Sequence, residues 1–254
     1  MKAKKHFGQH FLTSDETART IVNALGDLTS KDVLEIGPGM GIITQFMVHN
    51  CKSFQAVEID LEAVEYLEKK FKDIQLIKAD FLKVDLTQYF TTPFSLIGNF
   101  PYNISSQIVF KIIEHSDLIT NWVGMFQLEM GIRLVAQPKD KKDYGILSVL
   151  IPFYYKIETV MKLPPGAFNP PPKVNSIVVK AERSEHKPKC DMVLLKRVVK
   201  TAFGQRRKTL SNSLSSILPK DIINTHQFAT LRPENLSYLQ FEELSLFIEQ
   251  HVSN

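Results

Sequence analysis

Short apolar runs alternate with amphipathic stretches along residues 12–182. The runs have the length of buried strands, and the stretches between them have the apolar spacing of helices. Such alternation is typical of a parallel sheet that carries helices on both faces. We therefore expect strands at residues 32–36, 54–59, 74–79, 94–98 and 121–128, and helices at residues 15–25, from about 42, 61–71, 104–114 and 129–137.

The pattern changes twice toward the C-terminus. Runs at residues 147–153, 156–162 and 174–180 have no helix between them, which predicts an antiparallel edge to the sheet. The polar stretch 182–190 contains Pro188 and predicts a domain boundary. Helical spacing follows it, so we expect an α/β domain over residues 1–183 and a small all-α domain over 184–254, with helices at 191–203, 208–217, 220–228 and 237–251.

Basic residues are unevenly distributed along the chain. The net charge of +4 falls in residues 183–254, which carry 11 Lys and Arg against 7 Asp and Glu. A smaller basic group stands at Lys2, Lys4 and Lys5. A local surplus of this kind is found in chains that bind a polyanion and also on ordinary solvated surfaces. In loop 139–143 lysines alternate with aspartates, which favours a solvated loop.

A glycine-rich stretch, residues 37–41 (GPGMG), follows the first expected strand of the sheet. Glycines there let the backbone approach a ligand closely, although a tight turn alone would also need them. Glu58 closes the next strand about 20 residues on, where a carboxylate can accept both ribose hydroxyls of a dinucleotide or of S-adenosylmethionine. Asp80 follows the third strand and can accept from an adenine amino group. Glu35 precedes the glycines, and a buried carboxylate there needs a partner.

The fourth strand ends in Asn99-Phe100-Pro101-Tyr102. An exocyclic adenine amine is a poor nucleophile because its lone pair is delocalised into the ring. The Asn99 amide oxygen and the Phe100 carbonyl can both accept from that amine and localise the lone pair toward a sulfonium methyl group. Pro101 stiffens the turn, and Tyr102 offers a ring on which the base can stack. This motif favours methyl transfer from S-adenosylmethionine over hydride transfer, and it requires no metal.

At this point the chain resembles the KsgA/RsmA family of 16S ribosomal RNA adenine dimethyltransferases. Long segments match in order: KKHFGQHFL, EIGPGMG, AVEID, KADF, NFPYNISS, PPGAFNPPPKVNSIVV, AFGQRRKTLSNSL and RPENLSYLQFEELS. The resemblance implies a Rossmann-like class I methyltransferase core, a seven-stranded mixed sheet over residues 1–183, that binds S-adenosylmethionine. It also implies that the helical domain 184–254 binds RNA or the ribosome.

Individual roles follow from the same resemblance. Phe168 is expected to face Tyr102 across a flipped adenine, since an extruded base needs two walls. Two positions depart from the family pattern: His10 replaces an Asn, and Phe100 replaces a Leu. RNA phosphates are expected to meet Arg206, Arg207 and Lys208. The cofactor is expected to contact His10, Leu12, Gly37, Gly39, Glu58, Asp80 and Asn99.

The implied activity is N6,N6-dimethylation of two adjacent adenosines near the 3′ end of 16S ribosomal RNA, within the 30S particle and during ribosome assembly. We expect no membrane span, because no apolar run of about 18 residues exists, and a cytoplasmic location, because the two cysteines, Cys51 and Cys190, lie far apart. We also expect a monomer. Three alternatives stay open. They are an Erm-type methylase of 23S RNA, a DNA or protein-amide methylase, and a non-catalytic RNA-binding assembly factor.

Overall fold

The computed structural model describes residues 4 and 9–252. Lys2 and Lys5, and the first residues of the N-terminal motif FGQHFL, lie outside the described residues. Contacts divide the chain into two units: residues 1–131 with 156–183, and residues 132–155 with 184–254. The boundary at residue 183 coincides with the expected one. Residues 132–155, which were expected in the α/β domain, instead belong by their contacts to the C-terminal unit.

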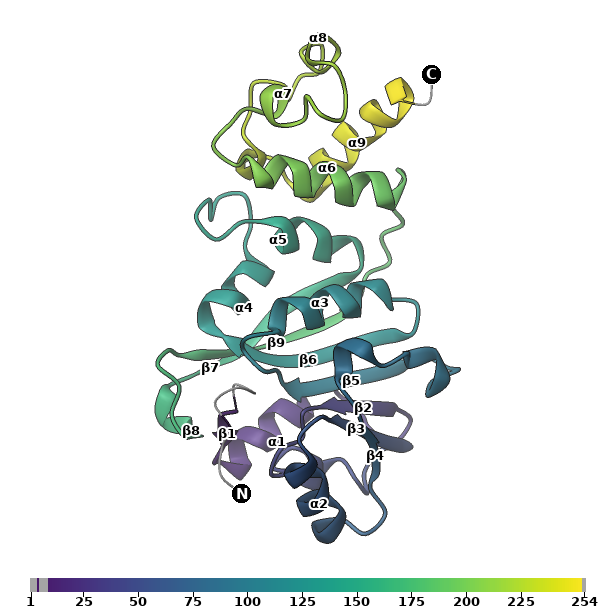
Figure 1. Ribbon diagram of the computed structural model, residues 1–254, viewed down its shortest axis with the longest axis vertical. Coiled ribbons are helices and arrows are strands. Elements are labelled where there is room, and N and C mark those ends of the chain that lie inside the picture. The colour runs from purple at the N-terminus through teal and green to yellow at the C-terminus, as the bar shows by residue number, and fades with distance from the viewer. Residues whose placement is uncertain (1–3, 5–8, 253–254) are drawn as a thin grey trace. The chain divides into compact units, whose positions relative to one another are not determined.

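Seven strands of the described chain form one sheet in the order β4-β3-β2-β5-β6-β9-β7 (Figure 1). Neighbours from β4 to β6 pair in parallel, and β9 pairs antiparallel with β6. This is the mixed sheet that the strand–helix alternation predicts. The strands are β2 (Asp32–Ile36), β3 (Ser53–Glu58), β4 (Gln75–Lys78), β5 (Phe94–Asn99), β6 (Ile119–Gln127), β7 (Tyr155–Leu163) and β9 (Ser176–Arg183).

Helices precede, separate and follow the parallel strands close to where the apolar spacing predicts them. They are α1 (Asp15–Asn23), α2 (Leu61–Lys70), α3 (Ser105–Glu114) and α4 (Leu128–Val135). Ser14 caps α1 by accepting from the Thr17 N–H, and Asp60 caps α2 by accepting from Glu62. Buried side chains of α1, Ala18, Ile21 and Val22, pack with the sheet in one hydrophobic cluster.

Two predictions before residue 183 are wrong. The run 147–153 is not a strand but α5 (Ile146–Leu150) followed by the 3₁₀ helix η5 (Ile151–Phe153). A run with one polar residue, Ser148, has too little periodicity to distinguish a strand from a buried helix. The helix expected from residue 42 is reduced to turns and η2 (Thr44–Phe46). The β-branched Ile42 and Ile43 are poor helix formers at its start.

The C-terminal unit contains α6 (Met192–Gly204) and α9 (Tyr238–Val252), close to the expected bounds. The two central helices are much shorter than expected, α7 (Leu210–Ser213) and α8 (Lys220–Ile223). Within SNSLSS, Ser213 donates to the Leu210 carbonyl and Ser215 to the Asn212 carbonyl, and Pro219 immediately precedes α8. Local side-chain bonding therefore ends the helical run early.

A two-stranded ribbon joins the N-terminal motif to the aromatic-proline loop. Strand β1 (Phe11–Leu12) pairs antiparallel with β8 (Phe168–Asn169), so segments far apart in sequence lie side by side (Figure 1). The Thr13 N–H extends the pairing by donating to the Ala167 carbonyl at 3.0 Å.

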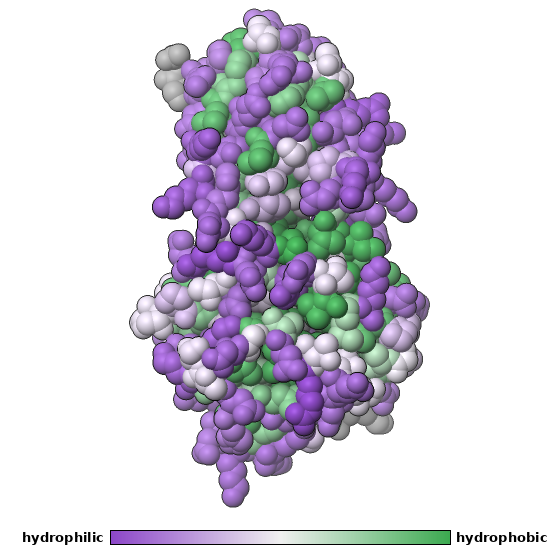
Figure 2. Space-filling model, turned by 180° about the vertical axis from the view of Figure 1, so that it is seen from behind, coloured by the Kyte–Doolittle hydropathy of each residue, from purple (hydrophilic) through white to green (hydrophobic). Residues whose placement is uncertain are grey.

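No helix among the described residues is long and apolar enough to cross a membrane. The face drawn in Figure 2 is mostly hydrophilic, with smaller hydrophobic areas between the polar side chains.

Candidate functional site

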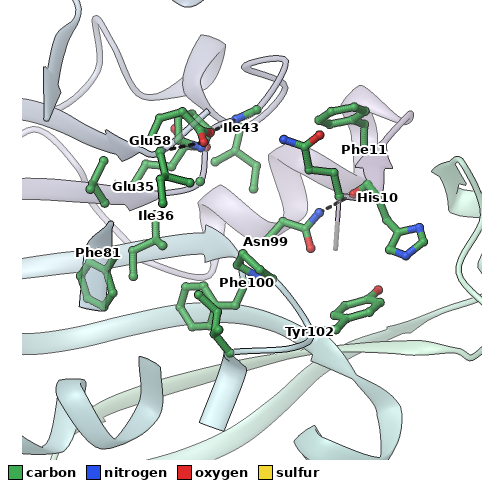
Figure 3. Close-up of a pocket in the computed structure, with 18 of the residues that line it drawn as sticks. His10, Phe11, Glu35, Ile36, Ile43, Glu58, Phe81, Asn99, Phe100 and Tyr102 are labelled. Atoms are coloured by element: carbon green, nitrogen blue, oxygen red, sulfur yellow. Dashed lines mark hydrogen bonds between the residues drawn. The ribbon is translucent and has the colours of Figure 1, made fainter. Parts of the chain in front are cut away.

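A cavity of about 260 Å³ opens at the carboxyl ends of β2, β3, β4 and β5. Open α/β sheets bind their ligands at this edge. Figure 3 shows Glu35, Glu58 and Phe81 toward one end of the cavity and His10, Asn99 and Tyr102 toward the other. All cofactor residues predicted from the sequence line it: His10, Leu12, Gly37, Gly39, Glu58, Asp80 and Asn99.

Left-handed backbone shapes the first wall. Gly37, Gly39 and Gly41 have φ values of 64°, 55° and 74°, which side chains rarely tolerate. A Cβ at Gly37 would meet nothing within 4 Å, so this backbone is open to a ligand. At Gly41 a Cβ would stand 2.6 Å from the Phe71 ring, so that glycine serves packing. The stretch therefore combines a ligand-facing glycine with a packing glycine.

Glu58 connects the two loops beside this wall. Its carboxylate accepts from Gly39 N at 3.1 Å and from Ile59 N and Asp60 N at 2.9 Å each. Burial raises the pKa of Glu58, while these backbone bonds oppose the increase. The contacts fix the carboxylate in the cavity wall, and its remaining lone pair, on Oε2, can accept from a ligand hydroxyl.

The buried Glu35 carboxyl has a hydrogen-bond partner, as expected for a polar group inside the sheet. It is only 1% exposed, and it accepts from the Thr44 hydroxyl at 2.7 Å. Desolvation by burial raises the pKa of Glu35 to about 8. At neutral pH this side chain is therefore mainly a neutral acid at the base of the cavity.

Asp80 both stabilises a helix terminus and lines the cavity. Its carboxylate caps the 3₁₀ helix η3 (Phe81–Lys83) by accepting from Leu82 N at 3.0 Å, and it lines the cavity. Lys111 of α3 stabilises the same turn. Its ammonium donates to the carbonyls of Phe81 at 2.7 Å and Leu82 at 3.1 Å, and also to that of Val84. Sequence reasoning missed Lys111, since one lysine inside an apolar helix face was its only signal.

The Asn99 amide has a defined orientation. Its Nδ2 donates to the main-chain carbonyl of His10 at 2.8 Å (Figure 3). An amide nitrogen committed as a donor leaves the oxygen Oδ1 as a pure acceptor. Asn99 therefore presents an acceptor to the cavity, as its predicted role requires.

Phe100 and Tyr102 have different surroundings. The Phe100 ring is fully buried and meets Phe126 edge-on, with centroids 5.1 Å apart. Gly98 and Gly124 make room for it, because a Cβ at either would stand 2.5 to 3.1 Å from backbone or ring atoms. Tyr102 is half-buried, and its hydroxyl lies 2.7 Å from the Ser176 hydroxyl. That bond holds the Tyr102 ring on the cavity wall.

His10 stands where the family pattern has Asn. Its ring stacks on Tyr102, with centroids 5.4 Å apart and planes 25° apart. The ring nitrogen Nδ1 lies 2.8 Å from the Pro170 carbonyl. Because a carbonyl only accepts, Nδ1 carries the proton.

The structure does not bring Phe168 to the cavity. Its side chain is 3% exposed and belongs to the hydrophobic cluster beneath α1. The pairing of β8 with β1 turns the Phe168 ring inward, opposite Leu12. The expected second wall facing Tyr102 is therefore not formed by Phe168 here, and the ring observed against Tyr102 is that of His10.

The three predicted RNA-binding residues differ in their exposure to solvent. Arg207 and Lys208 are exposed. Arg206 is partly covered, because it donates to the carbonyls of Lys141 and Lys142 and its Nε lies 3.4 Å from the Glu234 carboxylate. Among the described residues, no group of three or more His, Cys, Asp and Glu is arranged to hold a metal ion.

Comparison with known proteins gives consistent matches over the whole length. A family model described as "Ribosomal RNA adenine dimethylase" matches residues 1–250. A protein of Parabacteroides distasonis named "Ribosomal RNA small subunit methyltransferase A" is 46% identical over 99% of this chain and 96% of its own. A relative of the same name from Porphyromonas gingivalis is 45% identical over 98% of this chain and 99% of its own.

Solved structures agree on the fold. A dimethyladenosine transferase from Plasmodium falciparum superposes with a TM-score of 0.84 over 95% of this chain and 98% of its own, at 24% identity. The 23S rRNA methyltransferase ErmE superposes with a TM-score of 0.67 over 92% and 98%, at 25% identity. The predicted class I methyltransferase architecture is thereby confirmed.

Proposed function

The chain belongs to the ribosomal RNA adenine dimethylase family, and we propose that it uses S-adenosylmethionine to dimethylate N6 of two adjacent adenosines near the 3′ end of small-subunit ribosomal RNA. The observation that carries the proposal is the oriented Asn99 amide, whose free oxygen faces a cavity built on the glycine stretch and Glu58. The relatives named after small-subunit methylation support the choice of RNA.

The residues present fit the cofactor. Glu58 can accept from a ribose hydroxyl, the open backbone at Gly37 admits close approach, and Asp80 can accept from its adenine amine. When bound there, S-adenosylmethionine supplies an electrophilic methyl group. His10 and Leu12 close the same cavity from the N-terminal side.

The chain's own contribution to the reaction is positioning. Asn99 Oδ1 and the Phe100 carbonyl accept from the target amine, which localises the nitrogen lone pair and aims it at the methyl carbon. The Tyr102 ring holds the base by stacking, and Ser176 holds that ring. A bound cofactor would supply the methyl group, its S–CH₃ bond breaking as the new N–C bond forms and S-adenosylhomocysteine being left. The cationic amine would lose its proton to bulk solvent after transfer. Alignment and exclusion of water supply the rate, without a strong base.

The test is methyl transfer to purified 30S subunits from a strain that lacks the enzyme, with labelled cofactor and mapping of the modified bases. We expect label on two adjacent adenosines near the 3′ end of 16S RNA and none with Asn99→Ala. Exclusive labelling of 23S RNA would support the Erm-type activity. Labelling of DNA or protein in parallel reactions, or binding to 30S without any transfer, would also overturn the proposal.

Two further properties belong to this proposal. We infer that the chain acts as a monomer on the 30S particle, and that the C-terminal unit contributes the contacts to RNA. Because its substrate assembles in the cytoplasm, the enzyme is expected to work there.

A further inference from the structure

Arg206 links two basic segments of the C-terminal unit that lie more than 60 residues apart in the chain. Its guanidinium donates to the carbonyl of Lys142 at 3.3 Å and to that of Lys141, and its Nε faces Glu234. Figure 1 shows the loop before α5 beside the end of α6, where these bonds form. With its donors directed at protein groups, Arg206 is poorly placed for bidentate binding of a phosphate.

The loop that Arg206 holds is a closed turn. The Asp140 carboxylate accepts from Gln137 N at 2.9 Å, and the Asp140 carbonyl accepts from Asp143 N at 2.8 Å. Tyr144 ends the loop, is 2% exposed and packs its ring against Phe203 of α6. The turn is therefore anchored at its tip to Arg206, just after α6, and at its end to α6 itself.

One of the two carboxylates of this turn is engaged within the loop, whereas its lysines are exposed. The carboxylate of Asp140 is used by backbone within the loop. Lys139, Lys141 and Lys142 are exposed. The alternation of lysines with aspartates, which by sequence favours a solvated loop, here leaves the lysine ammonium groups outward.

We propose that the lysines of this turn and the exposed cations after α6 form one phosphate-binding surface, with Arg206 as its internal link rather than as a phosphate ligand. This inference rests on the proposed function, since its partner is the phosphate backbone of ribosomal RNA. Lysine and exposed arginine neutralise phosphates without reading bases. We call it the joint basic surface: Lys139, Lys141, Lys142, Arg207 and Lys208.

The first test compares two triple variants in binding to 30S subunits across a series of salt concentrations. One is Lys139→Ala/Lys141→Ala/Lys142→Ala. The matched control, Lys187→Ala/Lys189→Ala/Lys220→Ala, removes the same charge from exposed lysines of the same unit. We expect the first triple to weaken binding at least about tenfold near 150 mM salt and to flatten the log–log salt slope by about 2. Equal slopes for the two triples would overturn the joint surface.

The second test concerns the link itself. Arg206→Met removes the guanidinium but keeps an apolar stem, and it should weaken binding and speed hydrogen exchange in residues 138–144. Combined with the lysine triple it should add little, because both changes disable the same surface. Fully additive losses would show that Arg206 meets phosphate directly and would overturn its role as a link. Arg207→Ala is the comparison, since it should add to the triple.

Failure of this inference is separable from failure of the proposed function. Normal 16S methylation, together with equal salt slopes of 30S binding for the two triple variants, would contradict only the joint basic surface. Absence of methylation with the expected difference in slopes would sink only the proposed function.

Discussion

The side-chain amide of Asn99 donates to the main-chain carbonyl of His10 at 2.8 Å, so the N-terminal motif sets which amide atom faces the cavity. Asn99→Ala removes the acceptor and should lower kcat for methyl transfer by about 10²-fold or more, comparable to loss of one oriented polar group at a reacting centre. Affinity for 30S subunits should change little. The measurement is single-turnover methylation alongside a binding assay. Unchanged turnover would contradict the role of the amide.

The hydrogen bond between Tyr102 and Ser176 separates two contributions of Tyr102. Tyr102→Phe keeps the ring and loses only the hydroxyl bond, so kcat/KM should fall less than about fivefold. Ser176→Ala removes the same bond from the other side and should match it. Tyr102→Ala also removes the stacking surface, worth about 1–3 kcal/mol, and should cost roughly 10- to 100-fold. Equal effects of Tyr102→Phe and Tyr102→Ala would argue against stacking.

Phe168 should act through stability. Its ring is buried in the cluster beneath α1, so Phe168→Ala should lower the free energy of unfolding by about 3–5 kcal/mol. Phe168→Leu fills most of the space and should keep kcat within about threefold of the wild type. Urea unfolding and methylation rates measured on both variants test this. A large rate loss in Phe168→Leu at unchanged stability would restore the stacking role that the family resemblance implies.

Glu35 predicts a pH dependence of folding. In the unfolded chain a glutamate ionises near 4.5, whereas burial raises the pKa of Glu35 to about 8. The folded chain therefore binds more protons between these values, and its stability from this group is full below pH 4.5 and is lost as pH rises through 8. Glu35→Gln keeps an acceptor for Thr44 and should flatten the fall in unfolding free energy between pH 5.5 and 8.5.

Urea titrations at the two pH values measure this difference. Exposed Glu65 on α2 offers the control, because Glu65→Gln should leave the wild-type pH profile unchanged. An equally steep profile in Glu35→Gln would show that another group is responsible.

Lys111 should affect cofactor affinity more than turnover. Lys111→Met keeps the apolar stem but leaves three carbonyls of the Asp80 turn without their charged donor. We expect the KM for the cofactor to rise about tenfold while kcat at saturation stays within about threefold. Lys111→Arg should recover part of the affinity. Calorimetric binding of S-adenosylhomocysteine gives an independent readout, and a loss of kcat without loss of affinity would contradict the positioning role.

How far the sequence predicts this structure depends on whether a residue's role is local. Glu58 could be placed because strand ends in a parallel sheet meet at one edge, so a spacing of about 20 residues after the glycines specifies its location. The run 147–153 was wrongly predicted as a strand, because burial on nearly all sides removes the periodicity that would have shown a helix. Phe168 was misplaced for another reason: its orientation is set by pairing with β1, some 156 residues earlier in the chain. Lys111 and Arg206 act through backbone carbonyls, which leave no mark in the sequence.

The ribbon of β1 and β8 has a practical meaning for anyone who builds chimeras from relatives of this protein. Thr13 bonds to Ala167 through both its main chain and its hydroxyl, and the His10 ring bonds to the Pro170 carbonyl. We therefore expect that residues 10–13 and 167–170 must be exchanged together in a chimera. Exchanging only one of the two would unseat the backbone carbonyl that aims Asn99, even though every motif residue would still be in place.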